Sequence, residues 1–145
     1  LTREVMEFLE PKASENQIKL LFAAEYNDNM LVRADKEKIR TVLTNLMLNS
    51  IKYGKDGGRT KVSFYDMDEN YLIEISDNGV GIEEQHISRL FERFYRVDKH
   101  RSRAQGGSGL GLAIVKHIIE AHDQTINVRS APGVGSTFSF TLKKV

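Results

Sequence analysis

Apolar residues recur along this chain at two spacings, one typical of helices and one typical of strands. Repeats of three and four residues predict helices over residues 2–15, 35–53 and 109–122, with a shorter helix over residues 83–91. Alternating or continuous apolar runs predict strands over residues 18–24, 30–34, 60–65, 71–76, 125–130 and 136–142. Asp35 is a good N-cap for the long second helix, and Pro11 either kinks the first helix or opens a new one.

The order of these elements predicts the fold class. Two strand pairs surround short polar or glycine-rich turns, which indicates two antiparallel hairpins. We therefore expect an α+β protein, a two-layer sandwich in which about three helices cover one face of a mixed, mostly antiparallel sheet. The length of 145 residues suits one compact domain over residues 1–145.

Composition excludes several classes of protein. The formal net charge of +1 gives no bulk field for nucleic acid or an anionic membrane, so we expect no nucleic-acid partner. The absence of cysteine excludes disulfides, thiolate zinc sites and cysteine nucleophiles. No apolar run approaches the length of a membrane span, and no signal-peptide pattern opens the chain. The first residue is Leu1 rather than methionine, which suggests a piece of a longer protein.

A polar stripe follows the second predicted helix beside its apolar face. Asn45, Asn49, Lys52 and Tyr53 lie at positions i, i+4, i+7 and i+8, which places them on one side of a helix. An amide oxygen can ligate Mg²⁺, which keeps phosphate oxygens and waters as its other ligands. Lysine can neutralise phosphate, and tyrosine can cover a base or ribose. A solvated helix face is the alternative interpretation.

Two glycine-rich segments suggest a nucleotide site. Asp77 ends an alternating strand and could accept a hydrogen bond from an exocyclic amine, while Gly79 and Gly81 leave room for a flat ring. The alternative is an Asx turn after a strand. The glycines at 107, 109 and 111 open a helix, whose free N–H groups favour an anion such as phosphate. The preceding segment is a polar loop, so the context is not Rossmann-like, and no P-loop motif is present.

Five segments in order carry a family resemblance. They resemble the N, G1, F, G2 and G3 boxes of the ATP-binding catalytic domain of bacterial sensor histidine kinases, within the GHKL superfamily: residues 45–53 (NLMLNSIKY), 77–82 (DNGVGI), 91–96 (FERFYR), 107–112 (GSGLGL) and 133–138 (GVGSTF). The basic run FYRVDKHRSR is most similar to the phosphate-regulon type of sensor kinase. The resemblance covers nearly the whole chain and implies a Bergerat ATP-binding fold with an ATP lid at about residues 95–108.

The resemblance also implies roles for matching residues on the long helix and in the base pocket. Asn49 would ligate Mg²⁺, Asn45 would line the phosphate side of the same groove, Lys52 would contact phosphate, and Tyr53 would pack on the nucleotide. Asp77 would accept from the adenine amine, with the base pocket shaped by Gly79, Gly81 and Ile82. Thr137 lies where the family often has a hydroxyl near the pocket.

The lid region completes the implied site. The hinge of the lid would comprise Phe91, Phe94, Tyr95 and Arg96, and the phosphates would be received by Gly107, Gly109, Leu110 and Gly111. Candidates for contact with the γ-phosphate are Arg96, Lys99, Arg101 and Arg103, and a solvated loop is the alternative for each. Of all these residues, Asn45, Lys52 and Arg96 are the candidates for a direct part in catalysis.

Two departures from the family pattern stand out. The family often has His-Gly-Gly after the last helix, where this chain has His122, Asp123 and Gln124. Aspartate tolerates a left-handed helix cap, so we expect only a local change. Gly54 follows Tyr53 where serine or threonine is frequent, which removes a capping hydroxyl near the pocket.

The residue four positions before Asn49, the expected Mg²⁺ ligand, distinguishes kinases from hydrolases in this superfamily. ATP hydrolases of the superfamily typically have a glutamate four residues earlier, whereas this chain has Asn45, which cannot act as a general base. We therefore expect a protein-histidine kinase domain that binds ATP and Mg²⁺ and donates the γ-phosphoryl group to a histidine on a separate dimerisation helix. A GHKL-type ATP hydrolase and a non-catalytic nucleotide-binding or partner-binding module are the alternatives.

The resemblance also sets expectations about partners and location. None of the four histidines, His86, His100, His117 and His122, has the sequence context of a phospho-acceptor, so the acceptor helix is expected upstream of Leu1. The expected partners are the protein's own dimerisation helices and a cognate response regulator. The isolated domain is expected to be a monomer and the full-length protein a homodimer. The domain is expected to be cytoplasmic, with the full-length protein anchored in the bacterial inner membrane.

Overall fold

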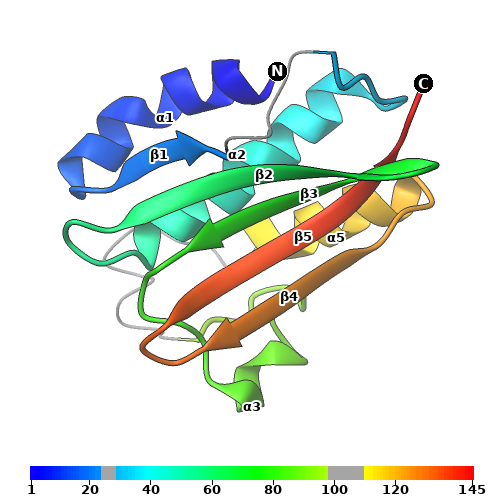
Figure 1. Ribbon diagram of the computed structural model, residues 1–145. Helices are drawn as coiled ribbons and strands as arrows, with labels where there is room; N and C mark the ends of the chain where they lie inside the picture. Colours follow the sequence, from blue (N-terminus) through cyan, green and yellow to red (C-terminus); the bar gives the residue numbers. More distant parts are fainter. Residues whose placement is uncertain (24–28, 98–109) are drawn as a thin grey trace.

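A five-stranded sheet packed against helices forms the fold (Figure 1). The structure is a computed structural model that describes residues 1–23, 29–97 and 110–145. The strands are β1 (Lys19–Phe22), β2 (Arg59–Met67), β3 (Asn70–Asp77), β4 (Ile126–Ala131) and β5 (Gly135–Lys143). Their order across the sheet is β1-β2-β3-β5-β4; β1 runs parallel to β2, and the other pairs are antiparallel. The predicted mixed, mostly antiparallel sheet is confirmed.

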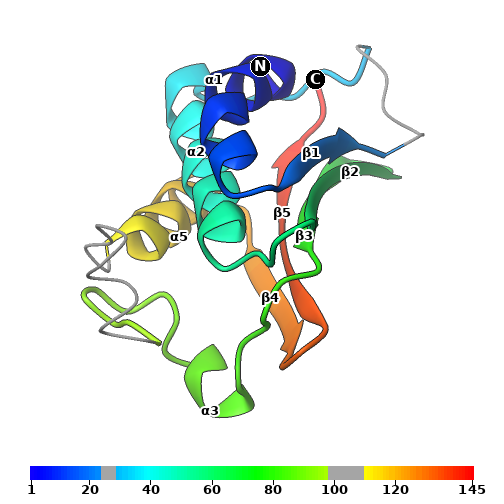
Figure 2. The same cartoon turned by 90° about the vertical axis from the view of Figure 1, so that its left-hand side faces the viewer.

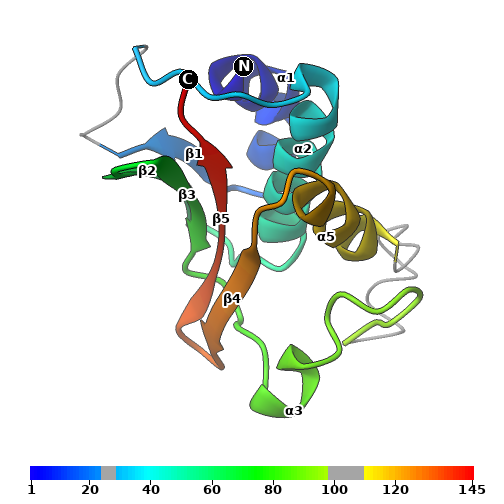
Figure 3. The same cartoon turned by 90° about the vertical axis from the view of Figure 1, so that its right-hand side faces the viewer.

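The described helices are α1 (Thr2–Glu15), α2 (Lys36–Lys52), α3 (Glu84–Ile87) and α5 (Gly111–Ala121). Figures 2 and 3 show α1, α2 and α5 together on one face of the sheet, with the opposite face left uncovered. The short α3 lies apart from them, near the lower end of β4. The two-layer arrangement with three covering helices is the one that the sequence predicts. None of the helices in the described ranges combines the length and the apolar character that a membrane span requires.

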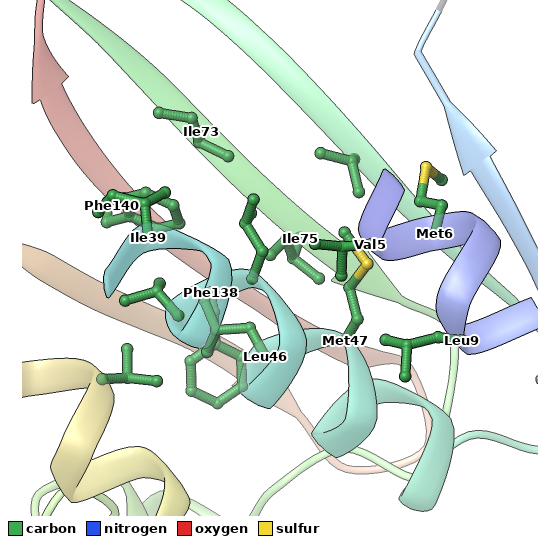
Figure 4. Close-up of a cluster of buried hydrophobic side chains, with 14 of the residues drawn as sticks. Val5, Met6, Leu9, Ile39, Leu46, Met47, Ile73, Ile75, Phe138 and Phe140 are labelled. Atoms are coloured by element: carbon green, nitrogen blue, oxygen red, sulfur yellow. The ribbon is translucent and has the colours of Figure 1, made fainter. Parts of the chain in front are cut away.

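The core lies between the helical layer and the covered face of the sheet (Figure 4). Leu46 and Met47 of α2 are fully buried, and Phe138 and Phe140 of β5 are buried in the same core cluster (Figure 4). Burying each such side chain contributes about 1.5–3 kcal/mol to stability. This packing holds α2 firmly on the sheet, so the polar stripe on the flank of α2 has a defined position.

Three boundary predictions have clear outcomes. Asp35 caps α2 as expected, because its carboxylate accepts a hydrogen bond from the Lys38 N–H at 3.1 Å. Pro11 lies inside α1, which continues through it as one helix, so no new helix opens there. The predicted strand over residues 30–34 is wrong: Val32 forms only an isolated bridge with Lys144. An apolar run without a long partner segment forms no ladder.

The end of α5 is held by His122. The His122 Nδ1 atom lies 2.8 Å from the Ile118 carbonyl, and Nε2 accepts a hydrogen bond from the Asp35 backbone N–H at 3.1 Å. Only the neutral imidazole with its proton on Nδ1 satisfies both contacts. Asp123 follows with φ of +57°, so the expected left-handed cap with only a local change is confirmed.

Candidate functional site

The polar stripe of α2 faces the start of α5. Asn45, Asn49, Lys52 and Tyr53 are all half-buried rather than exposed, so the stripe is not an ordinary solvated helix face. A Cβ atom placed on Gly111 would lie 3.4 Å from the Asn45 side-chain oxygen. The first turn of α5 therefore packs against the Asn45 side chain of α2, and the N-terminal end of a helix favours an anion.

Asp77 marks the other side of the site, at the end of β3. Its Oδ1 atom accepts hydrogen bonds from the backbone N–H groups of Gly79, at 2.9 Å, and Ser136, at 3.3 Å. The Asx turn considered for this position is therefore present. Burial raises the pKa of Asp77 above its ordinary value, and the hydrogen bonds from Gly79, Ser136 and the Ser50 hydroxyl oppose that rise. A carboxyl group with this degree of burial and a perturbed pKa is typical of a binding site.

Glycines let the segment after Asp77 press against neighbouring backbone. A Cβ atom on Gly79 would lie 2.2 Å from the Tyr53 carbonyl, and one on Gly81 would lie 2.1 Å from the Ala131 carbonyl. Gly81 also has φ of +75°, which disfavours any other residue. The Val80 N–H donates to the Tyr53 carbonyl at 3.1 Å. The segment is thus held between the end of α2 and the end of β4, at the end of the sheet where the β4–β5 turn also lies (Figure 1).

A pair of serines supports the same segment from β4 and β5. The Ile82 N–H donates to the Ser130 hydroxyl at 2.7 Å, and Ser130 in turn donates to the Gly135 carbonyl at 2.9 Å. The hydroxyl groups of Ser130 and Ser136 lie 2.7 Å apart. Reasoning from the sequence missed both serines. The signal available was register: both alternate with core residues along their strands, so they share the face of Asp77.

The placement of Thr137 in the pocket is wrong. In the β3–β5 pairing Ser136 lies opposite Asp77, and Thr137 lies opposite Ser76. Side chains alternate along a strand, so Thr137 points to the uncovered face of the sheet. There its hydroxyl shares a hydrogen bond with Ser76 at 3.0 Å. Ser136 is the hydroxyl-bearing residue on the side of Asp77.

The loss of a hydroxyl at Gly54 has a packing reason. A Cβ atom there would lie 2.6 Å from the Ile18 Cδ1 atom and 3.1 Å from the Ser50 carbonyl. A serine or threonine at this position would require the Ile18 side chain to shift. The smaller glycine fits here without that change.

The predicted hinge is attached at two points. The Phe91 ring meets Phe138 edge-on with 6.2 Å between centroids, which anchors the start of the hinge in the core. The Tyr95 hydroxyl forms a hydrogen bond with His86 Nδ1, and the Arg89 guanidinium lies 4.5 Å from the Tyr95 ring centroid. Phe94 lies between them at φ of +66° with 69% of its side chain exposed, an unusual conformation for an aromatic residue.

Arg96 and Leu110 lie on either side of residues 98–109, which the structure does not describe. Arg96 is half-buried, and Leu110 is the N-cap residue of α5, its carbonyl accepting from the Ile114 N–H at 3.0 Å. Several predicted lid and phosphate residues lie outside the described residues, namely Lys99, Arg101, Arg103, Gly107 and Gly109. Within the described ranges no three His, Cys, Asp or Glu side chains are grouped to hold a metal ion.

Comparison with known proteins identifies the family. Residues 34–145 match the family of histidine kinase-, DNA gyrase B-, and HSP90-like ATPases. The chain belongs to this family. It therefore carries an ATP-binding domain, and the expected nucleotide, ATP, is confirmed.

Relatives place this ATPase-family domain among the sensor kinases. It is 48% identical over 114 residues to the sensor-like histidine kinase SenX3 of Mycobacterium tuberculosis, a match covering 79% of this chain and 28% of SenX3. Its identity to the phosphate regulon sensor protein PhoR of Pseudomonas aeruginosa is 38% over 108 residues, covering 74% of this chain and 24% of PhoR. The resemblance to phosphate-regulon sensors is confirmed, although SenX3 shares more residues. The chain spans about a quarter of the length of these relatives.

Solved structures give the same result for the fold. The catalytic domain of histidine kinase ThkA is 28% identical with a TM-score of 0.83, covering 99% of this chain and 91% of that domain. Full-length ShkA in complex with AMPPNP has a TM-score of 0.84 at 27% identity, covering 99% of this chain and 29% of that one. The predicted sandwich fold and the identification as a histidine-kinase catalytic domain are confirmed. The roles of individual site residues remain predictions.

Proposed function

We propose that this chain binds ATP together with Mg²⁺ and donates the γ-phosphoryl group of ATP to a histidine on a separate dimerisation helix. The observation that carries the proposal is the contact between the first turn of α5 and the Asn45 amide on α2. This contact places the N-terminal end of α5, which favours an anion, next to the polar stripe of α2 with its amide oxygens and the Lys52 ammonium group. Asp77 lies on the side expected for the base. The three parts match the phosphates, the metal and the adenine of one ATP molecule.

The chemistry of the α2 stripe favours a phosphoryl acceptor other than water. Asn45 and Asn49 carry neutral amides, and Lys52 is a cation, so the described part of the stripe holds no carboxylate that could activate water. The carboxylate of Asp77 lies at the base side, where its Oδ1 atom accepts from the backbone N–H groups of Gly79 and Ser136. Phosphoryl transfer then depends on positioning and on neutralising charge.

The residues present fit a magnesium ion that arrives with its nucleotide. Asn49, supported by Asn45, offers a hard amide oxygen, and the described residues hold no acidic cage that would bind the metal alone. When bound, Mg²⁺ would neutralise charge on the phosphates, and Asn49 would hold it there with help from Asn45. Lys52 and Arg96 add positive charge on the same side.

The wider setting is part of the proposal. Residues 1–145 form one catalytic and ATP-binding domain, with a lid at about residues 95–108. The domain works as a monomeric unit on the cytoplasmic side, joined in the full-length homodimer to membrane-anchored dimerisation helices that carry the acceptor histidine. A response regulator then takes the phosphoryl group. The solved complex of histidine kinase ThkA, 28% identical to this chain, with the response regulator protein TrrA supports a response regulator as a partner.

Labelled ATP tests the proposal. The chain is incubated with Mg²⁺ and γ-labelled ATP, alone and with a separately purified dimerisation-helix protein from a sensor kinase similar to this chain. We expect acid-labile phosphohistidine on the helix protein and none on the chain. Rapid release of inorganic phosphate would instead support an ATP hydrolase. Binding without transfer or release would support a non-catalytic module.

A variant pair tests the metal role of Asn49. Asn49→Ala should abolish Mg²⁺-dependent transfer and weaken Mg²⁺-dependent binding of a non-hydrolysable ATP analogue in calorimetry. Asn127→Ala is the matched control, because Asn127 lies exposed on β4 and opposite Ser139 of β5. Equal behaviour of the two variants would remove Asn49 from the metal site.

A further inference from the structure

The hydroxyl of Ser130 has three partners in one place. It accepts from the Ile82 N–H at 2.7 Å, donates to the Gly135 carbonyl at 2.9 Å, and lies 2.7 Å from the Ser136 hydroxyl. Ser130 is half-buried and Ser136 is buried, so neither hydroxyl is freely solvated. The cluster joins the segment after Asp77 to the β4–β5 turn.

Counting protons leaves one arrangement that satisfies all three contacts. A serine hydroxyl has one proton and two lone pairs. The Ile82 N–H can only donate and therefore occupies one lone pair, and the Gly135 carbonyl can only accept and therefore takes the proton. The second lone pair of Ser130 remains for Ser136, so the Ser136 hydroxyl must donate its own proton to Ser130.

Ser136 lies beside Asp77, and its hydroxyl proton is already donated to Ser130. The two residues are opposite each other in the β3–β5 pairing, on the same face, and the Ser136 N–H donates to the Asp77 carboxylate at 3.3 Å. What remains on the Ser136 hydroxyl is acceptor capacity. The ionised carboxylate of Asp77 also only accepts. The Ser50 hydroxyl that bonds to Asp77 uses its proton on that carboxylate, so this corner of the base pocket presents acceptors to a ligand.

We propose that Ser130 is a positioning residue for base specificity, which directs the Ser136 proton away from the pocket so that the site takes a purine with an amino group at C6 and rejects one with a carbonyl there. Adenine carries an amino donor at this position, whereas guanine and hypoxanthine carry a carbonyl acceptor. A carbonyl would face the lone pairs of Asp77 and Ser136 and leave all of them unpaired. The inference rests on the proposed nucleotide site and names what selects its base.

Removing Ser130 should change selectivity rather than affinity alone. In Ser130→Ala the Ser136 proton is free to turn into the pocket and donate to a carbonyl oxygen. The test measures dissociation constants by calorimetry for ATP and for inosine triphosphate, which has a carbonyl in place of the amine. If Ser130 only supports the fold, the variant should bind both nucleotides more weakly by the same factor. If Ser130 sets the direction of the Ser136 proton, the ratio of the two dissociation constants should change.

We expect the wild-type chain to prefer ATP over inosine triphosphate by about 10- to 100-fold. Ser130→Ala should reduce that preference by about fivefold or more, and Ser130→Thr, which keeps the hydroxyl, should retain most of it. Thr137→Val is the matched control on the opposite face and should leave the ratio unchanged. If Ser130→Ala does not fold by circular dichroism, Ser136→Ala serves instead, because it removes the acceptor itself and should also lower the ratio.

An unchanged ratio in a folded Ser130→Ala, or in Ser136→Ala where that variant replaces it, would overturn the assignment. An equal loss for both nucleotides would do the same. These outcomes are separate from failure of the proposed function. A wild-type chain that binds neither nucleotide would contradict the nucleotide site, whereas normal ATP binding without transfer would contradict only the kinase activity.

Discussion

The base wall, formed by residues 77–82 and 130–136, and the hinge, formed by residues 91–96, are held in different ways. The wall bonds to several separate elements: Val80 to the end of α2, Asn78 Oδ1 to the Arg59 N–H of β2 at 2.9 Å, and Ile82 to Ser130 of β4. The hinge is held by the Phe91 ring in the core and by the Tyr95 contact with α3.

The difference separates two tasks within one site. A wall tied to α2, β2, β4 and β5 keeps its shape unless the sheet itself opens, so it can select a base by small differences in hydrogen bonding. A segment attached through two aromatic rings can change position without loss of the core. We therefore expect substitutions that displace the backbone of the wall to lower affinity and stability together, and those in the hinge to have small effects on both.

Gly81→Ala should give the largest effect, because it breaks the wall. The new Cβ atom would lie 2.1 Å from the Ala131 carbonyl at a φ of +75°. We expect a loss of about 2–5 kcal/mol in the free energy of unfolding. Displacing the wall removes the contacts to the base, so ATP affinity should fall by about 100-fold. Chemical denaturation and calorimetry measure the two quantities.

Gly133→Ala is the matched control for this prediction. Gly133 has a similar φ of +77°, but a Cβ atom there meets nothing within 4 Å. It should cost only about 1–2 kcal/mol from backbone strain and leave ATP affinity nearly unchanged. Equal effects from the two alanines would mean that close packing at Gly81 does not support the site.

Asp77→Asn should have the next largest effect, confined to binding. The amide oxygen can still accept from Gly79 and Ser136, so circular dichroism should show an intact fold. The amide NH₂ would oppose the amine of adenine, and we expect ATP affinity to fall by about 10- to 100-fold. Unaltered affinity in calorimetry would exclude Asp77 from the base pocket.

The same variant tests the buried charge through pH. Burial raises the pKa of Asp77 in the folded chain above its ordinary value of 3.8. Between that value and the raised pKa the folded state binds more protons than the unfolded state, so this contribution to stability falls as pH rises. Relative to the wild type, Asp77→Asn should therefore gain stability as pH rises through this window. Denaturation curves from about pH 3.5 to 7 would contradict this if the difference stayed constant.

Tyr95→Phe should give the smallest effect, because it changes only the attachment of the hinge to α3. The variant loses the hydroxyl contact with His86 but keeps the ring beside Arg89. We expect a loss of about 0.5–1.5 kcal/mol in unfolding free energy and less than about a threefold change in ATP affinity. Tyr65→Phe, on the exposed end of β2, is the control with no expected change. A large loss of affinity in Tyr95→Phe alone would show that the hydroxyl touches the nucleotide.

Sequence patterns predicted those features that depend on neighbouring residues. The Asp35 cap, the α2 stripe and the turn at Asp77 are local, because their partners lie within a few positions. The order of helices and strands gave the two-layer fold for a similar reason, since each element carries its own spacing of apolar residues.

Features that depend on strand pairing were missed or misplaced. Thr137 and Ser136 are neighbours in the chain, and only the register of β5 on β3 decides which of them faces Asp77. Ser130 had no signature of its own, because its partners Ile82 and Gly135 come from different segments. Residues 30–34 resemble a strand, but their pairing with the C-terminal segment stops at a single bridge, Val32 with Lys144.

Asp35 and His122 together close two helix ends at once. The Asp35 carboxylate caps the first turn of α2, and its backbone N–H is held by the imidazole that also bonds the last turn of α5. Fraying of either end therefore removes a partner from the other. The start of α2 and the end of α5 should open as one cooperative unit, so that their amide protons exchange with solvent at a common rate.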